Sequence, residues 1–387
     1  MANGTGILPS QDIKSMIKSG MIVPRKIPDD NIQPASLDLR VAEGEVIRLP
    51  GIFMPGMRDV YAFAKEQSEQ ASLYSIKNGD SEYVLELGVP YLVPVEEKLK
   101  LSGSISARAN NKSSSGRINL QVRLTCNNHP EYDSVPCGYK GPLYMIVVAK
   151  SFPVRIKPGQ TLNQLRFSRG TIENCRLAPY QIELEHEKNG LIYDLKSKKI
   201  PWKKVKSMSS SIVLTVNLKC NPVAYMANSS NQSCLNYADR NVDPLNFFEP
   251  IARSKDGKIL LRKGGFYILA TNEAFSVGSH LCSEMVAYST GMGEFRSHFA
   301  GFFDPGWGSN PKYGTCGSPA VLEIIPHEDI ILKHGDSVCA MELYHMTENP
   351  PAIYGDVANN YHLQTGPRLG KQFKFTGLIT KKIRSRR

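Results

Sequence analysis

Short apolar runs, cut by Pro and Gly, follow one another along most of the chain. They are rich in Val, Ile, Leu and Tyr, as in YVLEL, PYLVPV, LYMIVVAK, FYILAT and AVLEIIP, and such runs are typical of strands. A helical period occurs near the start, where Ile13, Met16 and Ile17 share one face. Ser10 is the expected N-cap of this helix and Gly20 its end. The pattern predicts an all-β dominated protein, a barrel or sandwich with few short helices.

Two pairs of segments repeat with one spacing. Residues 83–97 match 259–273, and 154–167 match 330–343, with 259 − 83 = 176 and 330 − 154 = 176. Two matches in one register indicate a duplicated fold. Dividing 387 residues by two gives roughly 190 per copy, which is enough for a domain with its own core.

Positive charge is concentrated in two places. The net charge is +11, yet six Lys lie in 196–206 and seven Lys or Arg in 371–387, so the remainder has 47 − 13 = 34 basic and 36 acidic residues. We therefore expect two nearly neutral domains, 1–195 and 211–370, joined by a basic linker, 196–210, and followed by a basic tail. A nucleic-acid partner is not expected, although the tail alone leaves a contact with RNA, DNA or an acidic surface open.

Composition narrows the class of protein further. Apolar residues make up 41% of the chain and charged residues 21%, and no run reaches the roughly 18 apolar residues of a membrane span. The N-terminus lacks the features of a signal peptide, so a cytoplasmic location is expected. The eight Cys are scattered without a CxxC pair, which predicts free thiols rather than disulfides or a zinc site.

Three constellations are candidates for chemistry. The turn from Lys112 to Arg117, KSSSGR, offers hydroxyls, backbone N–H groups and two cations for a phosphate chain or a developing anion, or it is an ordinary surface turn. The turn from Asp304 to Trp307 places a carboxylate and an indole at a strand end, or is a β-turn with a packing Trp. Glu323 interrupts the apolar run AVLEII, either on a wet face or in a desolvated position that suits a general base.

With further segments, these motifs resemble the dCTP deaminases of the dUTPase-like superfamily, in their longer, tandem form. The first half has IQPASLDLR at 32–40 and the KSSSGR loop, which are similar to the family's I-x-P-A-S-x-D-L-R strand and R-S-S-x-x-R loop. The second half has FDPGW at 303–307, the pair Leu322-Glu323, and Tyr354 with YHLQTGP at 361–367. The resemblance implies two tandem dUTPase-like β-barrel domains of distorted jelly-roll type.

It also implies hydrolytic deamination of dCTP to dUTP and ammonia, supplying dUTP for dUMP and dTTP synthesis. Glu323 would be the general base that activates water for attack on C4 of cytosine, and Ser113 and Arg117 would orient that water and stabilise charge. The route would need no zinc, since H-x-E and P-C-x-x-C motifs are absent from the sequence. A Mg²⁺ ion would accompany the triphosphate, bound mainly by its oxygens.

The remaining roles concern substrate binding. By resemblance, Lys112 and Ser114 would hold the triphosphate, and Asp304 would lie near the deoxyribose 3′-hydroxyl. The other expected substrate-binding residues come from the second half of the chain: Trp307, Tyr354, Tyr361 and Gln364.

Departures from the family pattern suggest how the site is assembled. When the two halves are aligned at the 176 spacing, Glu323 is aligned with Val147, and Arg117 is aligned with Gly293. Each half thus lacks one part of the site, which predicts a composite site, within one chain or between chains of a homo-oligomer. Three two-barrel chains forming two stacked rings would satisfy three-fold symmetry. Lys112 also replaces the family's Arg, and Asn360 stands where a phosphate-binding Lys is usual.

Two alternatives remain open. A bifunctional dCTP deaminase and dUTP diphosphatase would hydrolyse its product to dUMP. The hydrolases have D-x-x-Y where this chain has DPGW, so Trp307 favours deamination while Asp304 leaves the second activity open. The other alternative is a catalytically inactive nucleotide-binding relative.

Overall fold

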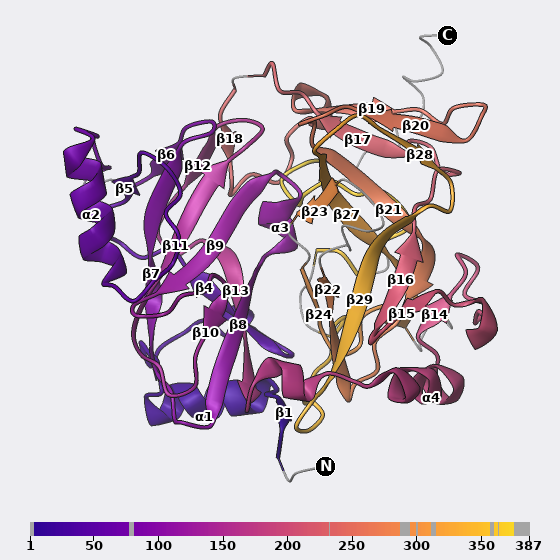
Figure 1. Cartoon of the computed structure of the whole chain (residues 1–387), viewed down its shortest axis with the longest axis horizontal. Helices are drawn as coiled ribbons and strands as arrows, with labels where there is room; N and C mark the ends of the chain where they lie inside the picture. Colours follow the sequence, from indigo (N-terminus) through magenta and orange to yellow (C-terminus); the bar gives the residue numbers. More distant parts are fainter. Residues whose placement is uncertain are drawn as a thin grey trace. The chain divides into compact units, whose positions relative to one another are not determined.

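The computed structural model describes residues 4–76, 81–231, 233–286, 295–298, 301–310, 315–356, 360–362 and 364–374. The chain forms two compact units (Figure 1), each assembled from separate stretches. Unit 1 contains Met1–Arg176, Gln232–Ala238 and Tyr344–Ala352, and unit 2 contains Leu177–Asn231, Asp239–Leu343 and Ile353–Arg387. Strands dominate both units and helices are few, which confirms the all-β dominated prediction.

Unit 1 is built from three sheets. The six-stranded sheet has the order β10 (Ser134–Val135), β8 (Ile105–Asn111), β13 (Thr161–Arg169), β4 (Ser36–Arg40) and β3 (Ile32–Gln33), with β1 (Gly6–Ile7) also on β13. The five-stranded sheet has the order β2 (Ile22–Val23), β7 (Pro90–Lys100), β11 (Lys140–Ala149) and β9 (Leu120–Cys126), with β5 (Ile47–Arg48) also on β7. The third has the order β18 (Leu235–Asn236), β12 (Val154–Ile156) and β6 (Tyr83–Leu85).

The described residues of unit 2 form two larger sheets and two strand pairs. The six-stranded sheet has the order β19 (Phe248–Ile251), β17 (Ala224–Ala227), β21 (Tyr267–Phe275), β27 (Ser318–Pro326) and β23 (Phe295–His298), with β14 (Ile192–Tyr193) on β21. The five-stranded sheet has the order β15 (Ser207–Met208), β16 (Ser211–Thr215), β29 (Ser337–His345), β22 (Leu281–Val286) and β24 (Phe302–Phe303). The pairs are β20 (Lys258–Leu261) with β28 (Ile330–Lys333), and β25 (Ser309–Asn310) with β26 (Thr315–Cys316).

Strand pairing repeats at the spacing found in the sequence. In unit 1, Leu85 of β6 pairs with Val154 of β12. In unit 2, Leu261 of β20 pairs with Ile330 of β28, and each residue lies 176 positions after its counterpart (261 − 85 and 330 − 154). The duplication therefore preserves which residues face one another across a strand pair, and not only the sequence motif.

Helix α1 (Ser10–Ser19) confirms the helix predicted at the start of the chain. Gly20 ends it in the left-handed conformation, with φ 79°, and its N–H donates to the carbonyls of Ile17 and Met16. The N-cap, however, is Pro9, so the predicted cap Ser10 is instead the buried first residue of the helix.

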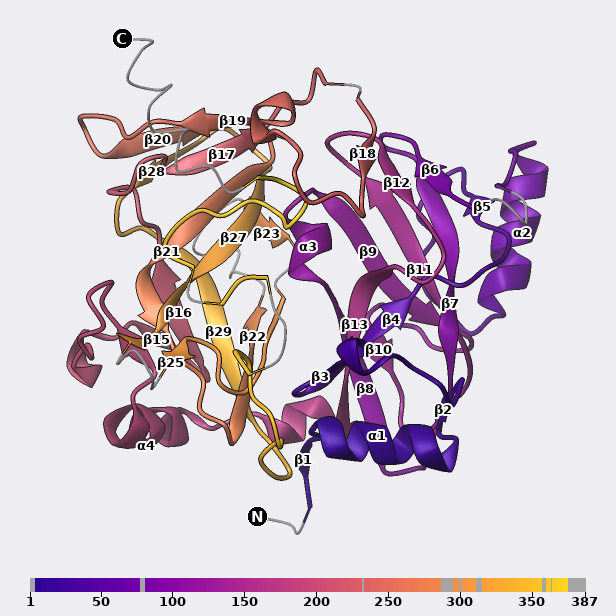
Figure 2. The same cartoon turned by 180° about the vertical axis from the view of Figure 1, so that it is seen from behind.

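Two further long helices were not predicted from the sequence, which showed a helical period near the start of the chain. They are α2 (Val60–Gln70) and α4 (Pro179–Asn189); α2 lies beside β5 at the edge of unit 1 (Figure 2). Asp59 caps α2 by accepting the N–H of Ala62 at 2.8 Å. The buried face of α2 consists of Val60, Ala64 and Ser68, and these small side chains give too weak an apolar period to stand out. The shorter helices are α3 (Ser113–Gly116), η1 (Asp29–Asn31), η2 (Ile172–Cys175), η3 (Trp202–Lys204) and η4 (Pro244–Asn246).

The Lys-rich stretch 196–210, which was expected to be a linker, is part of unit 2. The first long stretch of unit 1 ends earlier, at Arg176. The carbonyl of Ile200 lies 2.7 Å from Nε2 of His186, and the ring of Trp202 packs 5.5 Å from the same imidazole. Of the predicted tail, residues 375–387 lie outside the described residues.

All eight Cys are free, as predicted. No helix within the described ranges is long and apolar enough to cross a membrane.

Candidate active site

The KSSSGR loop forms a tight helical turn directly after β8. The N–H groups of Ser115 and Gly116 donate to the carbonyl of Lys112 at 2.9 Å, and Arg117 N–H donates to the carbonyl of Ser113 at 3.0 Å. Ser114 and Arg117 are buried, each with 3% of its surface exposed. Lys112 and Ser113 are half-buried. The ordinary surface turn considered as an alternative would leave the guanidinium in solvent, and this structure does not.

Lys112 is held by a residue of the first-half motif. Its ammonium forms an ion pair with the carboxylate of Asp38 in β4, and 4% of the Asp38 side chain is exposed. An ammonium carries three N–H donors, so this ion pair and a phosphate contact are compatible. The sequence analysis did not assign Asp38 a role, although it lies within the 32–40 segment that carries the resemblance.

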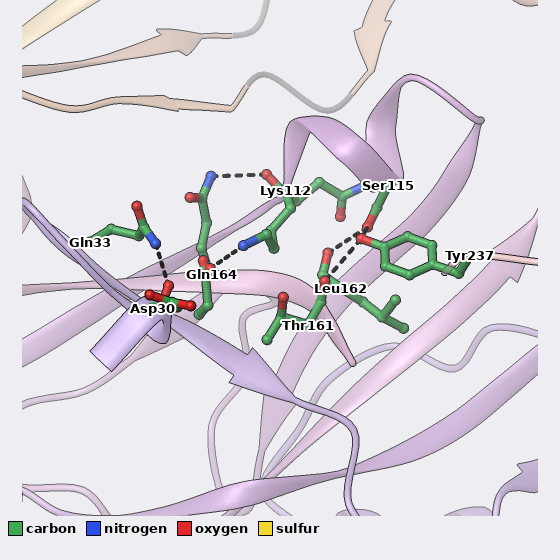
Figure 3. Close-up of polar contacts among 10 residues, drawn as sticks. Asp30, Gln33, Lys112, Ser115, Thr161, Leu162, Gln164 and Tyr237 are labelled. Atoms are coloured by element: carbon green, nitrogen blue, oxygen red, sulfur yellow. Dashed lines mark hydrogen bonds and ion pairs between the residues drawn. The ribbon is translucent and has the colours of Figure 1, made fainter. Parts of the chain in front are cut away.

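The backbone on both sides of Lys112 is fastened to β13. The N–H of Lys112 donates to the carbonyl of Leu162 at 3.2 Å, and the side-chain amide of Gln164 donates to the carbonyl of Asn111 at 3.0 Å (Figure 3). The loop therefore starts from a fixed point, and its side chains are positioned by a sheet rather than by a free turn.

Glu323 is buried in the middle of β27, with 4% of its surface exposed. The flanking Leu322 and Ile324 are fully buried members of the unit 2 core, and cross-strand neighbour Ile268 of β21 is also buried. The wet-face alternative is therefore wrong for Glu323. Glu323 is therefore shielded from solvent within the described part of the chain.

The same position in unit 1 has no acid. Glu323 pairs with His298 of β23, and Val147 of β11 pairs with Val122 of β9. The differences 323 − 147 and 298 − 122 are both 176, so Val147 and Glu323 are structural equivalents. The other predicted departure, Gly293 opposite Arg117, lies outside the described residues.

The DPGW segment is a turn in which both Asp304 and Trp307 are buried. Trp307 N–H donates to the carbonyl of Asp304 at 3.0 Å. Gly306 has φ 88°, and a Cβ there would lie 2.7 Å from Cβ of Ile353, so both backbone and space require glycine.

The indole of Trp307 packs edge-on against Phe303 at 5.0 Å and also lies 5.0 Å from the ring of Tyr354. Trp307 therefore packs against aromatic side chains, as the alternative of a β-turn with a packing Trp predicts. Its Nε1 is buried and has no hydrogen-bond partner within the described part of the chain. A buried donor without a partner is costly, so an acceptor on a water or a ligand would fit here.

The C-terminal segment is attached to the same region of unit 2. Tyr354 N–H donates to the carbonyl of Pro305 at 2.7 Å, and the Gln364 amide donates to the carbonyl of Pro319 in β27 at 2.9 Å. The Tyr361 hydroxyl is buried and accepts the N–H of Lys371 at 3.0 Å. Asn360 is exposed, and Leu363 of the predicted motif lies outside the described residues.

The predicted site residues thus form two groups. Lys112, Ser113, Ser114 and Arg117 belong to unit 1, and the other six belong to unit 2: Asp304, Trp307, Glu323, Tyr354, Tyr361 and Gln364. Within unit 2, the DPGW turn contacts Tyr354, and Gln364 is attached to the strand that carries Glu323. Across the described ranges, no group of three or more His, Cys, Asp and Glu side chains could hold a metal ion.

Family models match both halves of the chain. The 2'-deoxycytidine 5'-triphosphate deaminase (DCD) N-terminal domain matches residues 4–171, and the DCD C-terminal domain matches residues 181–373. The chain belongs to the dCTP deaminase family. The resemblance found in the sequence is thereby confirmed.

Similar members of the dCTP deaminase family differ in length. A dCTP deaminase from Acidianus ambivalens is 31% identical over 177 residues, covering 45% of this chain and 92% of that relative. A dUMP-forming dCTP deaminase from Methanobrevibacter smithii is 25% identical over 219 residues, covering 55% of this chain and 98% of that relative. The crystal structure of the 2'-deoxycytidine 5'-triphosphate deaminase from Agrobacterium tumefaciens, 32% identical, superimposes with a TM-score of 0.79 over 90% of this chain and 99% of that one.

Proposed function

We propose that the protein is a dCTP deaminase, which converts dCTP and water into dUTP and ammonia and so supplies dUTP for dUMP and dTTP synthesis. Family membership over both halves supports this reaction, and the buried carboxyl of Glu323 is the observation that carries it. An acid at the centre of an apolar strand is costly to stability. Its unit 1 equivalent, Val147, shows that the fold does not require an acid there.

Glu323 is the proposed general base. It takes a proton from water, and the hydroxide adds to C4 of cytosine to form a tetrahedral carbon. The carboxyl group then returns the proton to the departing amino group, the C4–N4 bond breaks, and a carbonyl forms at C4. A side chain placed within hydrogen-bond reach of the water can carry this proton between the two groups.

The loop in unit 1 supplies the positive charge. Ser113 orients the attacking water, and Arg117 stabilises the negative charge that develops during the addition. A guanidinium fixed in a buried position acts more strongly on such charge than one in water, and it needs little rearrangement. This requires the unit 1 loop and the Glu323 pocket of unit 2 to form one composite site, either within a chain or between chains.

The nucleotide is held by residues from both groups. Lys112 and Ser114 bind the triphosphate, whose Mg²⁺ arrives as part of the substrate and is held by phosphate oxygens. Asp304 lies near the 3′-hydroxyl of the sugar, and Trp307 offers its buried N–H and indole face. Tyr354 and Gln364 close over the phosphates, and Tyr361 is a further substrate-binding residue.

No zinc takes part in this proposal. Zinc-dependent nucleobase deaminases need an H-x-E motif with P-C-x-x-C, and this sequence contains neither. A buried carboxylic acid and a buried arginine would perform the proton transfer and the charge stabilisation in place of the metal.

The finer architecture is also proposed. Two dUTPase-like barrels of distorted jelly-roll type, one per unit, would explain the repeated strand registers. A homo-oligomer, with three chains in two stacked rings, would give three-fold symmetry. A cytoplasmic location would suit an enzyme of nucleotide metabolism.

A second candidate is a bifunctional enzyme that also hydrolyses dUTP to dUMP. Asp304 favours it, because the hydrolases of the superfamily use an acid at this position, and a relative is named as dUMP-forming. A catalytically inactive nucleotide-binding relative is a third reading.

One assay separates the three. Ammonia release and product identity are measured with dCTP and Mg²⁺ for wild type, Glu323→Gln and Arg117→Ala. Formation of dUTP that is lost in both variants supports the deaminase with a composite site. Accumulation of dUMP shows the second activity, and nucleotide binding without turnover would leave only the inactive relative.

A further inference from the structure

A short segment from the second half of the sequence completes the third sheet of unit 1. Strand β18 pairs in parallel with β12, with Leu235 opposite Val154. The N–H groups of Leu235 and Tyr237 donate at 2.9 Å to the carbonyls of Pro153 and Arg155. The residues on either side, up to Asn231 and from Asp239, belong to unit 2. The chain thus enters unit 1 for a few residues and leaves again.

This segment brings the ring of Tyr237 beneath the KSSSGR loop. Tyr237 is buried, with 2% of its surface exposed. Its hydroxyl lies 3.0 Å from Oγ of Ser115 and 2.9 Å from the carbonyl oxygen of Thr161 (Figure 3). Ser115 is fully buried, and its Oγ also lies 2.8 Å from the carbonyl oxygen of Leu162.

Two hydroxyl protons serve these three contacts. Carbonyls only accept, so Tyr237 and Ser115 are the donors, and each carries one O–H. If Tyr237 donates to Thr161, Ser115 donates either to Tyr237 or to Leu162. If Tyr237 donates to Ser115, then Ser115 donates to Leu162. In two of these three arrangements a hydrogen bond joins Tyr237 to Ser115, and in all three the hydroxyls connect Tyr237 and the helical turn to the start of β13.

We infer that Tyr237 is a positioning residue for the loop of the active site, supplied to unit 1 by the second half of the chain. Ser115 lies in the single helical turn between Ser113 and Arg117, so a shift of Ser115 moves both residues. The inference rests on the proposed function, because that function assigns the loop its roles with water and substrate. A displacement of catalytic groups by about an ångström can cost on the order of 100-fold in rate.

The test compares two Tyr→Phe variants of the full-length protein. Tyr237→Phe removes the hydroxyl beneath the loop. Tyr83→Phe is the matched control, because Tyr83 lies in β6 of the same sheet, is equally buried, and donates its hydroxyl to the carbonyl of Gly44 at 3.2 Å. Both variants lose one buried hydroxyl from one sheet, but only Tyr237 contacts the loop.

We expect kcat/KM for dCTP to fall about tenfold in Tyr237→Phe, mostly through kcat, and to stay within about twofold of wild type in Tyr83→Phe. The melting temperatures of the two variants should be similar. Ser115→Ala should resemble Tyr237→Phe, and the double variant should lose no more than the worse single variant, since the pair acts as a unit.

The outcomes separate the inference from the proposed function. If wild type does not deaminate dCTP, the proposed function is wrong and this inference falls with it. If wild type is active but Tyr237→Phe equals Tyr83→Phe in kcat and KM, the inference alone is overturned. Fully additive losses in the double variant would also overturn it.

Discussion

The two units share one carboxylate, which is buried in unit 1 and half-buried in unit 2, and they differ at another. Glu97 of unit 1 and Glu273 of unit 2 are 176 residues apart (273 − 97). In unit 1, Glu97 accepts the backbone N–H of Arg40 at 2.9 Å and its Nε–H at 2.7 Å. In unit 2, Glu273 accepts the backbone N–H and the hydroxyl of Thr215, each at 2.7 Å. One carboxylate therefore caps one strand in both units, with a charged partner in one and a neutral partner in the other.

Positions 147 and 323 show the opposite behaviour. The pairing with the neighbouring strand, β9 in unit 1 and β23 in unit 2, is conserved, but the side chain is a core valine in unit 1 and a buried acid in unit 2. An acid that recurs in both copies is explained by the fold. An acid that occurs in one copy, at a position where the fold accepts an apolar side chain, calls for an explanation in function.

The largest effect is expected from separating the halves. A fragment containing residues 1–176 lacks Gln232–Ala238 and Tyr344–Ala352, which belong to unit 1. It loses the β18 pairing and the Tyr237 side chain from a buried position. We expect no cooperative unfolding transition in circular dichroism, since these losses are a large fraction of a domain's net stability of about 5–15 kcal/mol. Co-expression with residues 177–387 is the control; a fragment with a sharp transition of its own would contradict the expectation.

The next comparison tests the equivalent positions 323 and 147. Glu323→Gln should lower kcat for dCTP by about 10²–10⁴-fold, the usual contribution of a general base, with the protein still folded. Val147→Ala should lower stability by about 2 kcal/mol through lost burial and a small cavity, with kcat unchanged. Steady-state kinetics and denaturant unfolding measure both. A Glu323→Gln enzyme of near wild-type kcat would remove this residue from the mechanism.

Arg40→Thr would make the unit 1 carboxylate resemble that of unit 2. Removing the guanidinium from buried Glu97 should cost about 3–5 kcal/mol near neutral pH. Burial raises the pKa of Glu97 above its ordinary 4.5, and Arg40 acts in the opposite direction. Stability contributed by a group with a raised folded pKa is present at low pH and is lost as pH rises through that pKa. Without Arg40 the folded pKa rises further, so the cost should shrink as pH falls towards 4.5. A pH-independent cost, measured by urea unfolding, would contradict this reasoning.

The smallest effect is expected at the counterpart in unit 2. Thr215→Val keeps the shape of the side chain and the backbone bond to Glu273, and removes the hydroxyl bond alone. Loss of a hydrogen bond to a charged group costs about 1.5–3 kcal/mol. Thermal unfolding of Thr215→Val should therefore show a smaller shift than Arg40→Thr; a larger shift would mean that the two carboxylates do not play equivalent roles.

Much of this architecture is readable from the sequence, because strand runs, the 176 spacing and the first helix all depend on local pattern. The position of Glu323 within AVLEII left two alternatives open, and its burial excludes the wet face, while its role as a general base stays a prediction. Helix α2 was missed because its buried face uses Val60, Ala64 and Ser68, which carry little apolar signal. The Lys-rich stretch was taken for a linker because its charge gives no information about the contact between half-buried Trp202 and buried His186.

Contacts between distant segments left no local signal at all. The Lys112 ion pair joins residues 74 positions apart, and the contact of Tyr237 with Ser115 joins residues 122 positions apart. Tyr237 stands in an ordinary polar stretch, SCLNYADR, so neither periodicity nor spacing distinguishes it. Its position depends on β18 pairing with a strand of the other half, and only the folded structure shows that.

The interleaved segments also constrain the order in which the two units can fold during synthesis. A ribosome delivers the chain from its N-terminus, and domains commonly fold in that order. Here Tyr344–Ala352 is part of unit 1, whose first long stretch ends at Arg176. The N-terminal unit therefore waits for almost the whole polypeptide before it can be finished, although it emerges first. During that wait its incomplete sheet has an unpaired edge, so a chaperone that shields strand edges should matter more for this protein than for one whose two copies fold in turn.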